Sequence, residues 1–137
     1  MAQTLRSKDM PKEQQHFVVD AKHMLLFLGA DPSICGYRYT LDALCVIYDA
    51  NGDQLAMTKC LYPTVASHYL TTSSKVERGI RHLVDKLVMG KTLVKLNQFS
   101  QYTIYTPGDN MCNSKFLYLL YTLLMSPMQK ERRKQNG

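Results

Sequence analysis

The chain has 137 residues, enough for one ordinary domain with a single buried core and too few for two. Lys and Arg number 17 against 11 acidic residues, a formal net charge of +6 that favours a polyanion such as nucleic acid as a partner. The most apolar run, residues 116–125, is about half of the roughly 20 residues needed to cross a bilayer as a helix, so it is not a membrane anchor.

Residues 1–15 carry charged and glutamine side chains with few apolar ones. Burial there cannot offset the entropy of ordering the chain, so we expect a flexible arm. The same segment lacks the basic and then apolar pattern of a signal peptide. This predicts a protein that stays in the cytoplasm.

A first helix is predicted over residues 16–28, where apolar side chains recur at steps of three and four, and Gly29 ends it. Residues 31–36 are typical of a turn, after which Thr40 is placed to cap a second helix. Asn51-Gly52 then ends that helix. A hairpin at this Asn-Gly is disfavoured, because the flanking segments do not alternate.

A third helix is predicted over residues 57–69, with Pro63 in its first turns or at a small bend. Residues 70–73 form a tight connection rich in hydroxyl side chains, which can satisfy free helix amides. A fourth helix follows at about 74–89, and Gly90 ends it. Two helices joined by so short a turn are typical of a helix-turn-helix motif.

The remaining third of the chain contains shorter elements. Residues 92–99 are predicted as a short element, 102–105 have the composition of a strand, and 107–110 form a loop. Asn113-Ser114 opens a last helix over 115–125. We expect a folded domain over residues 16–126, followed by a basic tail, residues 127–137. That tail either attracts phosphate non-specifically or is a frayed end.

The predicted helix 74–89 has two different sides. Its apolar residues fall within about a quarter turn of a helical wheel; they are Val76, Ile80, Leu83, Val84 and Leu87. The opposite side carries Ser74, Arg78, Arg81, His82 and Asp85, flanked by Lys75 and Lys86. The wheel alone favours an ordinary solvated face. The preceding helix, at the spacing of a helix-turn-helix pair, favours a DNA-reading face, although the turn lacks the usual glycine.

On this interpretation the helix enters the major groove of a duplex. Arg78 and Arg81 are the expected base readers, because a guanidinium pairs with O6 and N7 of guanine as a planar fork. Thr72, Ser73 and Ser74 offer hydroxyls and free amides for phosphate. Glu77 stands at capping-box spacing from Ser74, so it either caps its own helix or reads a base.

The predicted last helix is apolar nearly all round. One side has the spacing of a core face: Phe116, Leu119, Leu120, Leu123 and Leu124. A second burial surface is needed for Leu117, Tyr118, Tyr121 and Met125. Either a dimer contact, which we favour, or the N-terminal arm covers these residues.

No catalytic or metal-binding pattern is found. The histidines at 16, 23, 68 and 82 lack metal-ligand spacing, and no nucleophile motif is present. Cys35, Cys45, Cys60 and Cys112 form no CxxC pair. We expect thiols in a reducing compartment, no metal or other cofactor, and no enzymatic activity.

Four blocks of the sequence resemble the C-terminal effector domain of the stage-zero sporulation protein A response regulators. They are GYRY at 36–39, TKCLYP at 58–63, TTSSKVERGIRH at 71–82 and NSKF at 113–116. Together they span about His16 to Met125. The third block is the most specific, because it runs through the turn and along the outward side of the predicted recognition helix.

The resemblance implies an all-α fold of about six helices around a helix-turn-helix core, and binding to a short box of double-stranded DNA to activate or repress promoters. It implies base-facing positions at Lys75, Glu77, Arg78, Arg81 and His82. The expected phosphate-binding positions are Thr58, Lys59, Thr71, Thr72, Ser73, Ser74 and Lys86. RNA polymerase and a second copy or related regulator are further expected partners.

Three residues depart from the family pattern. Lys75 stands where the family has arginine, which replaces a fork by a point charge. Leu70 stands where the family has a small polar turn residue, and Lys115 replaces an acidic one.

The family's regulators also carry a phosphorylated receiver domain, for which 137 residues leave no room. The chain is therefore expected to be either an effector fragment or a free-standing paralogue. A rival hypothesis is a protein-interaction module that pairs with a full-length regulator through the last helix and modulates it.

Overall fold

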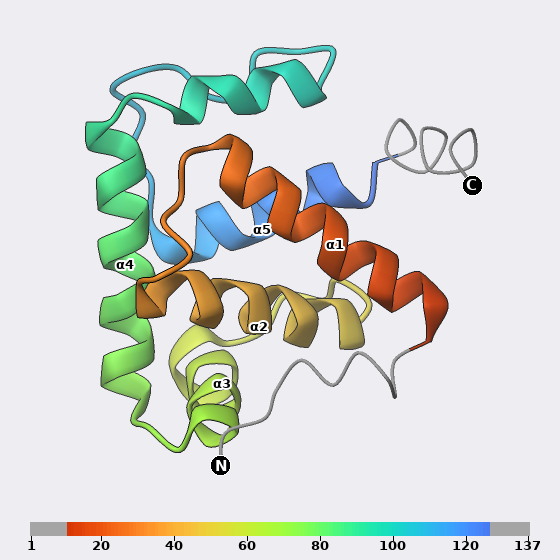
Figure 1. Ribbon diagram of the computed structural model, residues 1–137, viewed down its shortest axis with the longest axis vertical. Coiled ribbons are helices and arrows are strands. Elements are labelled where there is room, and N and C mark those ends of the chain that lie inside the picture. The colour runs from red at the N-terminus through yellow and green to blue at the C-terminus, as the bar shows by residue number, and fades with distance from the viewer. Residues whose placement is uncertain (1–10, 127–137) are drawn as a thin grey trace.

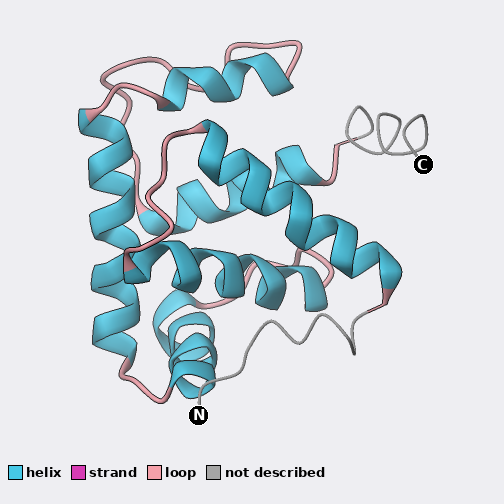
Figure 2. Ribbon diagram, viewed as in Figure 1, coloured by secondary structure: helices cyan, strands magenta, loops and turns pink. Residues whose placement is uncertain are grey.

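The computed structural model describes residues 11–126, and this part of the chain contains helices and no strands (Figures 1 and 2). The elements are α1 (Lys12–Phe27), α2 (Cys35–Asp49), the π-helical segment η2 (Met57–Leu61), α3 (Tyr62–Tyr69), α4 (Ser73–Met89), the 3-10 helix η3 (Leu93–Phe99) and α5 (Asn113–Leu124). The prediction of an all-α fold is confirmed. Of the helices described, none is long and apolar enough to cross a membrane.

The core is organised around α2, which packs against each of the other four α-helices. Most of its residues are buried, including Leu41, Leu44 and Ile47. Figure 1 shows α4 running along one edge of the molecule, across the direction of α2, with α1 and α5 on the other side of α2 from α3. Helix α4, which carries the candidate DNA-reading face, therefore packs mainly against α2.

The start of α2 differs from the prediction. The helix begins at Cys35, so Thr40 lies inside it; the Thr40 side chain is fully buried and its Oγ1 has no hydrogen-bond partner. Only the first part of the predicted turn is present, where Asp31 Oδ1 accepts hydrogen bonds from the Ser33 backbone N–H at 2.9 Å and from its hydroxyl at 2.8 Å. Sequence reasoning took Gly36 as a turn residue, but it lies within the helix.

The first helix is longer than predicted. It begins at Lys12 rather than at 16, so its first turn includes residues assigned to the arm. The rest of the predicted arm and the predicted basic tail lie outside the described residues. The predicted end is confirmed, since Gly29 follows the helix with φ +90°, a conformation that favours glycine.

The predicted helix over residues 57–69 is divided into η2 and α3. The backbone N–H groups of Cys60 and Leu61 both donate to the Ala56 carbonyl, at 2.9 and 3.0 Å, which makes a wide first turn. Pro63 follows in the first turn of α3, where its missing N–H costs no intrahelical bond.

No strand forms at residues 102–105, so the prediction from their composition was wrong. Instead the Asn97 side chain holds this segment. Its Oδ1 accepts from the backbone N–H groups of Ile104 at 2.8 Å and Tyr105 at 2.9 Å, and its Nδ2 donates to the Tyr105 carbonyl at 2.9 Å. A side chain supplies the hydrogen bonds that a neighbouring strand would otherwise make.

The second side of α5 is covered by the chain itself. Leu117 is fully buried, so the prediction that it lies on a dimer surface was wrong. The Tyr118 hydroxyl donates to the Asp53 carbonyl at 2.9 Å and accepts from the Leu55 N–H at 2.7 Å. The rings of Tyr121 and Phe17 pack with centroids 5.8 Å apart. Met125 is half-buried as well, so the chain itself covers part of the predicted dimer surface.

Candidate nucleic-acid interface

Two helices, α3 and α4, are joined by a tight turn and packed crosswise, so that Figure 1 looks nearly along α3 while α4 lies in the plane of the view. The turn begins at Leu70, a leucine in left-handed backbone with φ 53° and ψ 45°. The Thr71 N–H then donates back to the Ala66 carbonyl at 3.0 Å. This arrangement is the helix-turn-helix that the sequence predicted.

The cap of α4 is Thr72, whose hydroxyl accepts a hydrogen bond from the Lys75 N–H at 3.2 Å. Sequence reasoning placed a capping box at Ser74 and Glu77, two residues too late. Because the real N3 residue is Lys75, no reciprocal acidic partner exists. Glu77 is left for another role.

The predicted apolar stripe of α4 is confirmed. Each member is at most 4% exposed: Val76, Ile80, Leu83, Val84 and Leu87. The opposite side is open, with exposed side chains at Ser74, Lys75, Arg78, Arg81, His82, Asp85 and Lys86. No other described element covers the two arginines. A duplex can therefore approach this side of the helix.

The arginine pair is not equivalent in its bonding. Arg81 Nη1 donates to Glu77 Oε2 at 2.6 Å, and the two side chains are 54% and 33% exposed. Within residues 11–126 the Arg78 guanidinium has neither a hydrogen-bond acceptor nor an ion-pair partner. The Arg78 guanidinium is thus available to bind an acceptor on another molecule. The Arg81 guanidinium must keep Glu77 as a partner or release it before binding another acceptor.

Two hollows flank the outward side of α4. The one towards α2 has a volume of about 380 Å³ and is lined by Cys35, Tyr39, Lys75, Arg78, Gly79 and His82. The one towards α5 has about 360 Å³ and is lined by Tyr62, Glu77, Arg81, Asp85, Met111, Cys112, Asn113 and Ser114. Arg78 and Arg81 lie one turn apart, yet they border different hollows.

Two glycines set the distance between α2 and α4. A Cβ added at Gly36 would lie 2.3 Å from the Gly79 carbonyl oxygen, and one added at Gly79 would lie 2.9 Å from Tyr39 Cδ2. The two backbones are therefore in direct contact at this crossing. Sequence reasoning missed both roles, although a glycine inside a helical pattern such as Gly79 is a recognised sign of close packing.

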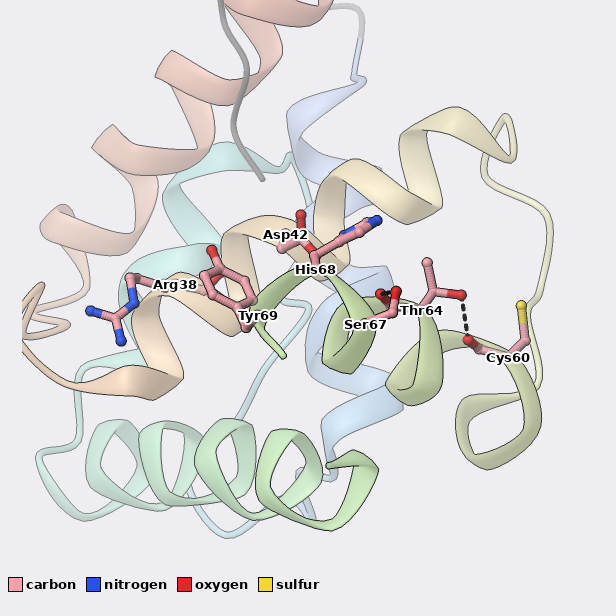
Figure 3. A network of polar contacts seen from close by, with 7 residues as sticks. All are labelled: Arg38, Asp42, Cys60, Thr64, Ser67, His68 and Tyr69. Carbon is pink, nitrogen blue, oxygen red and sulfur yellow. Dashed lines mark hydrogen bonds and ion pairs between the residues drawn. The ribbon is translucent and has the colours of Figure 1, made fainter. Parts of the chain in front are cut away.

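A polar contact fixes α3 against α2 (Figure 3). His68 Nδ1 lies 2.7 Å from Asp42 Oδ2, and the aspartate side chain is 3% exposed. Burial raises the pKa of the Asp42 carboxyl, and the hydrogen bond from His68 opposes that rise without cancelling it. The Tyr69 hydroxyl donates to the Arg38 carbonyl at 3.4 Å in the same contact. Partners 26 residues apart give no sequence signal.

A second polar contact joins α4 to α5. Asn113 Nδ2 donates to the Glu77 carbonyl at 3.0 Å and to the Tyr62 hydroxyl at 3.1 Å, and the Asn113 side chain is buried. Burial raises the pKa of Tyr62, so its hydroxyl stays protonated. Sequence reasoning assigned Asn113 only to the opening of a helix. Its amide in fact links α5 to α4, through Glu77, and to α3, through Tyr62.

The predicted phosphate-binding residues are spread over both ends of the motif. Thr58 and Lys59 are exposed on η2, and Thr72, Ser74 and Lys86 are exposed on or beside α4. Thr71 and Ser73 are half-buried in the turn and the first turn of α4. Thr71 to Ser74 lie in the turn and the first turn of α4 and Lys86 lies near its end, whereas Thr58 and Lys59 precede α3, at the end of that helix away from the turn.

A comparison with known families identifies the family to which most of the chain belongs. The model of the family described as sporulation initiation factor Spo0A C terminal matches residues 21–124. The match covers most of the chain and contains the whole of α2, α3, α4 and α5. Both glycines of the α2–α4 crossing and every residue of the open side of α4 fall inside it.

Proposed function

Because the chain belongs to the family of the sporulation initiation factor Spo0A C-terminal domain, whose members bind DNA and regulate transcription, we propose that it is a sequence-specific regulator with α4 in the major groove. The observation that carries this proposal is the exposed Arg78 guanidinium, opposite the buried stripe of α4 and without a partner among residues 11–126. Its N–H donors are available to pair with O6 and N7 of guanine, as reading that base in the major groove requires.

Residues around Arg78 complete the proposed base-reading set. Arg81 reads a second base when Glu77 releases it or turns with it, and Lys75 assists as a point charge. Glu77 and His82 belong to the same set by their places on the helix. Phosphate contacts are proposed for Thr58, Lys59, Thr71, Thr72, Ser73, Ser74 and Lys86, which would fix register without reading sequence.

The rival hypothesis, a protein-interaction module, has less support. Its first motive was apolar surface at Tyr118, Tyr121 and Met125, and these side chains are half-buried against the core. Its second motive, Lys75 in place of arginine, is unaffected. Pairing with a second copy or with RNA polymerase, and action on sporulation genes in the cytoplasm, remain proposals that follow from DNA binding.

The test compares Arg78→Ala and Arg78→Lys with the parent chain. The duplex is selected from a random library by the parent, and a scrambled duplex is the reference. We expect Arg78→Ala to lose about 1–3 kcal/mol on the selected duplex and to relax preference at one base pair. Arg78→Lys should retain the charge and still lose specificity, because it lacks the fork. Lys22→Ala, an exposed change on α1, serves as the charge control. Equal losses on both duplexes would show that Arg78 does not read a base.

A further inference from the structure

The hollow between α2 and α4 is built from both helices. Cys35 and Tyr39 come from the first turns of α2, and the other four lining residues come from α4. Its volume of about 380 Å³ lies within the range of clefts that hold ligands, roughly 300–1,000 Å³. It opens beside the Arg78 side chain, on the side proposed to face the duplex.

The charges around this hollow have one sign. Lys75, Arg78 and His82 are exposed on successive turns of α4, and among its lining residues there is no carboxylate. Arg38 adds a further cation at the edge, with Nη2 3.6 Å from Cys35 Sγ. The hollow on the α5 side differs, because Glu77 and Asp85 line it together with Arg81. An anion is therefore favoured on the α2 side only.

The rest of the lining is apolar. The Tyr39 ring and Gly79 form it, and a Cβ at Gly79 would lie 2.9 Å from Tyr39 Cδ2. A group with an apolar ring and an adjacent anion matches this combination of lining and rim. The sugar and phosphate of a nucleic-acid backbone are such a group.

We propose that this hollow holds one deoxyribose-phosphate unit of the strand beside α4, so that α2 takes part in DNA binding. The inference rests on the proposed function and revises it at two residues: Lys75 and His82 contact phosphate instead of bases, while Arg78 reaches the bases. It also brings an exposed thiol, Cys35, into the interface. Cys112 lines the opposite hollow and is equally exposed, which provides an internal control.

The first experiment is thiol protection on the full chain. The rates at which N-ethylmaleimide alkylates Cys35 and Cys112 are measured by peptide mass spectrometry, with and without the selected duplex. At about 100 times its Kd the duplex leaves about 1% of the protein free, so protection of Cys35 should exceed about tenfold. Cys112, which lines the other hollow beside Arg81, should be protected less than Cys35. An unchanged Cys35 rate on saturated protein would overturn the proposal.

The second experiment places a carboxylate in each hollow. Cys35 is the first residue of α2 and Cys112 is the N-cap of α5, so aspartate suits the helix start at both positions and both variants should fold. Cys35→Asp should weaken binding of the selected duplex by about tenfold or more, because it opposes a phosphate. Cys112→Asp, beside Arg81 in a hollow that already holds Glu77 and Asp85, should weaken binding less than Cys35→Asp does. Equal affinities of the two variants would contradict the proposal.

The experiments distinguish failure of the hollow proposal from failure of the DNA-binding proposal. If Arg78→Ala loses specificity while Cys35 stays unprotected and Cys35→Asp binds normally, DNA reading stands and the hollow has no part in it. If no duplex is preferred by the parent chain, the proposed function falls and the inference falls with it.

Discussion

Replacing Gly36 by alanine should separate the two helices that position the recognition face. The new Cβ would lie 2.3 Å from the Gly79 carbonyl oxygen and 3.1 Å from Leu83 Cβ. Ordinary contacts begin near 3.4 Å, so the gap is short by about 1 Å at a point where the nearest neighbour is backbone. A flexible side chain could turn aside, but a helix carbonyl cannot.

The expected cost follows from two opposing effects. Forcing an extra methyl group into a packed crossing costs about 1–3 kcal/mol. Alanine regains up to about 1 kcal/mol in a helix interior, and less in the first turn where Gly36 lies. The net loss should be about 1–2 kcal/mol. That is a substantial part of the roughly 5–15 kcal/mol by which small domains are stable.

The assay is urea unfolding followed by far-ultraviolet circular dichroism. Gly36→Ala should lower the midpoint without changing the slope, because the surface exposed on unfolding stays the same. Gly90→Ala is the matched control: φ there is −77°, and the new Cβ would lie 3.2 Å from the Lys86 carbonyl oxygen, short of an ordinary contact by only about 0.2 Å. It should change stability by no more than about 0.5 kcal/mol. A Gly36→Ala chain as stable as the parent would refute the claim that α2 and α4 touch through their backbones.

Three further changes test individual contacts. Thr72→Ala removes the α4 cap and should cost about 0.5–2 kcal/mol in the same urea assay; an unchanged midpoint would exclude the capping bond. Tyr118→Phe leaves the Leu55 N–H without its acceptor and should cost about 1–3 kcal/mol, measured as a lower unfolding temperature. Asp42→Asn tests pH dependence. Because burial raises the folded pKa of Asp42 above 3.8, its contribution is full below that value and is lost as pH rises through the folded pKa. The parent should therefore lose stability relative to Asp42→Asn from about pH 4 upwards, and a constant difference across unfolding curves at pH 3 to 7 would contradict this.

The sequence predicts α4 well, since its apolar residues repeat with an unambiguous period. The exposed side chains followed from the same wheel. Capping is less predictable, because Thr72 and Ser74 are both good caps and only the turn geometry decides between them. The end of α3 at Leu70 is also hard to predict, because leucine seldom adopts left-handed backbone.

Contacts between helices are beyond a single sequence. Nothing local distinguishes Gly36 in a tight crossing from a glycine in a turn, and nothing links Asp42 to His68. The separation of Arg78 from Arg81 has the same origin, because α2 borders one and α5 borders the other. The second face of α5 was misjudged because the helix pattern shows that a cover is needed without showing which segment provides it.

The central position of α2 has a thermodynamic consequence. Each of the other four α-helices packs against it, so these helices should unfold together with α2. A duplex bound only to α4 would then raise the unfolding temperature of all five α-helices. It would also slow hydrogen exchange in α1, the helix farthest along the chain from the turn.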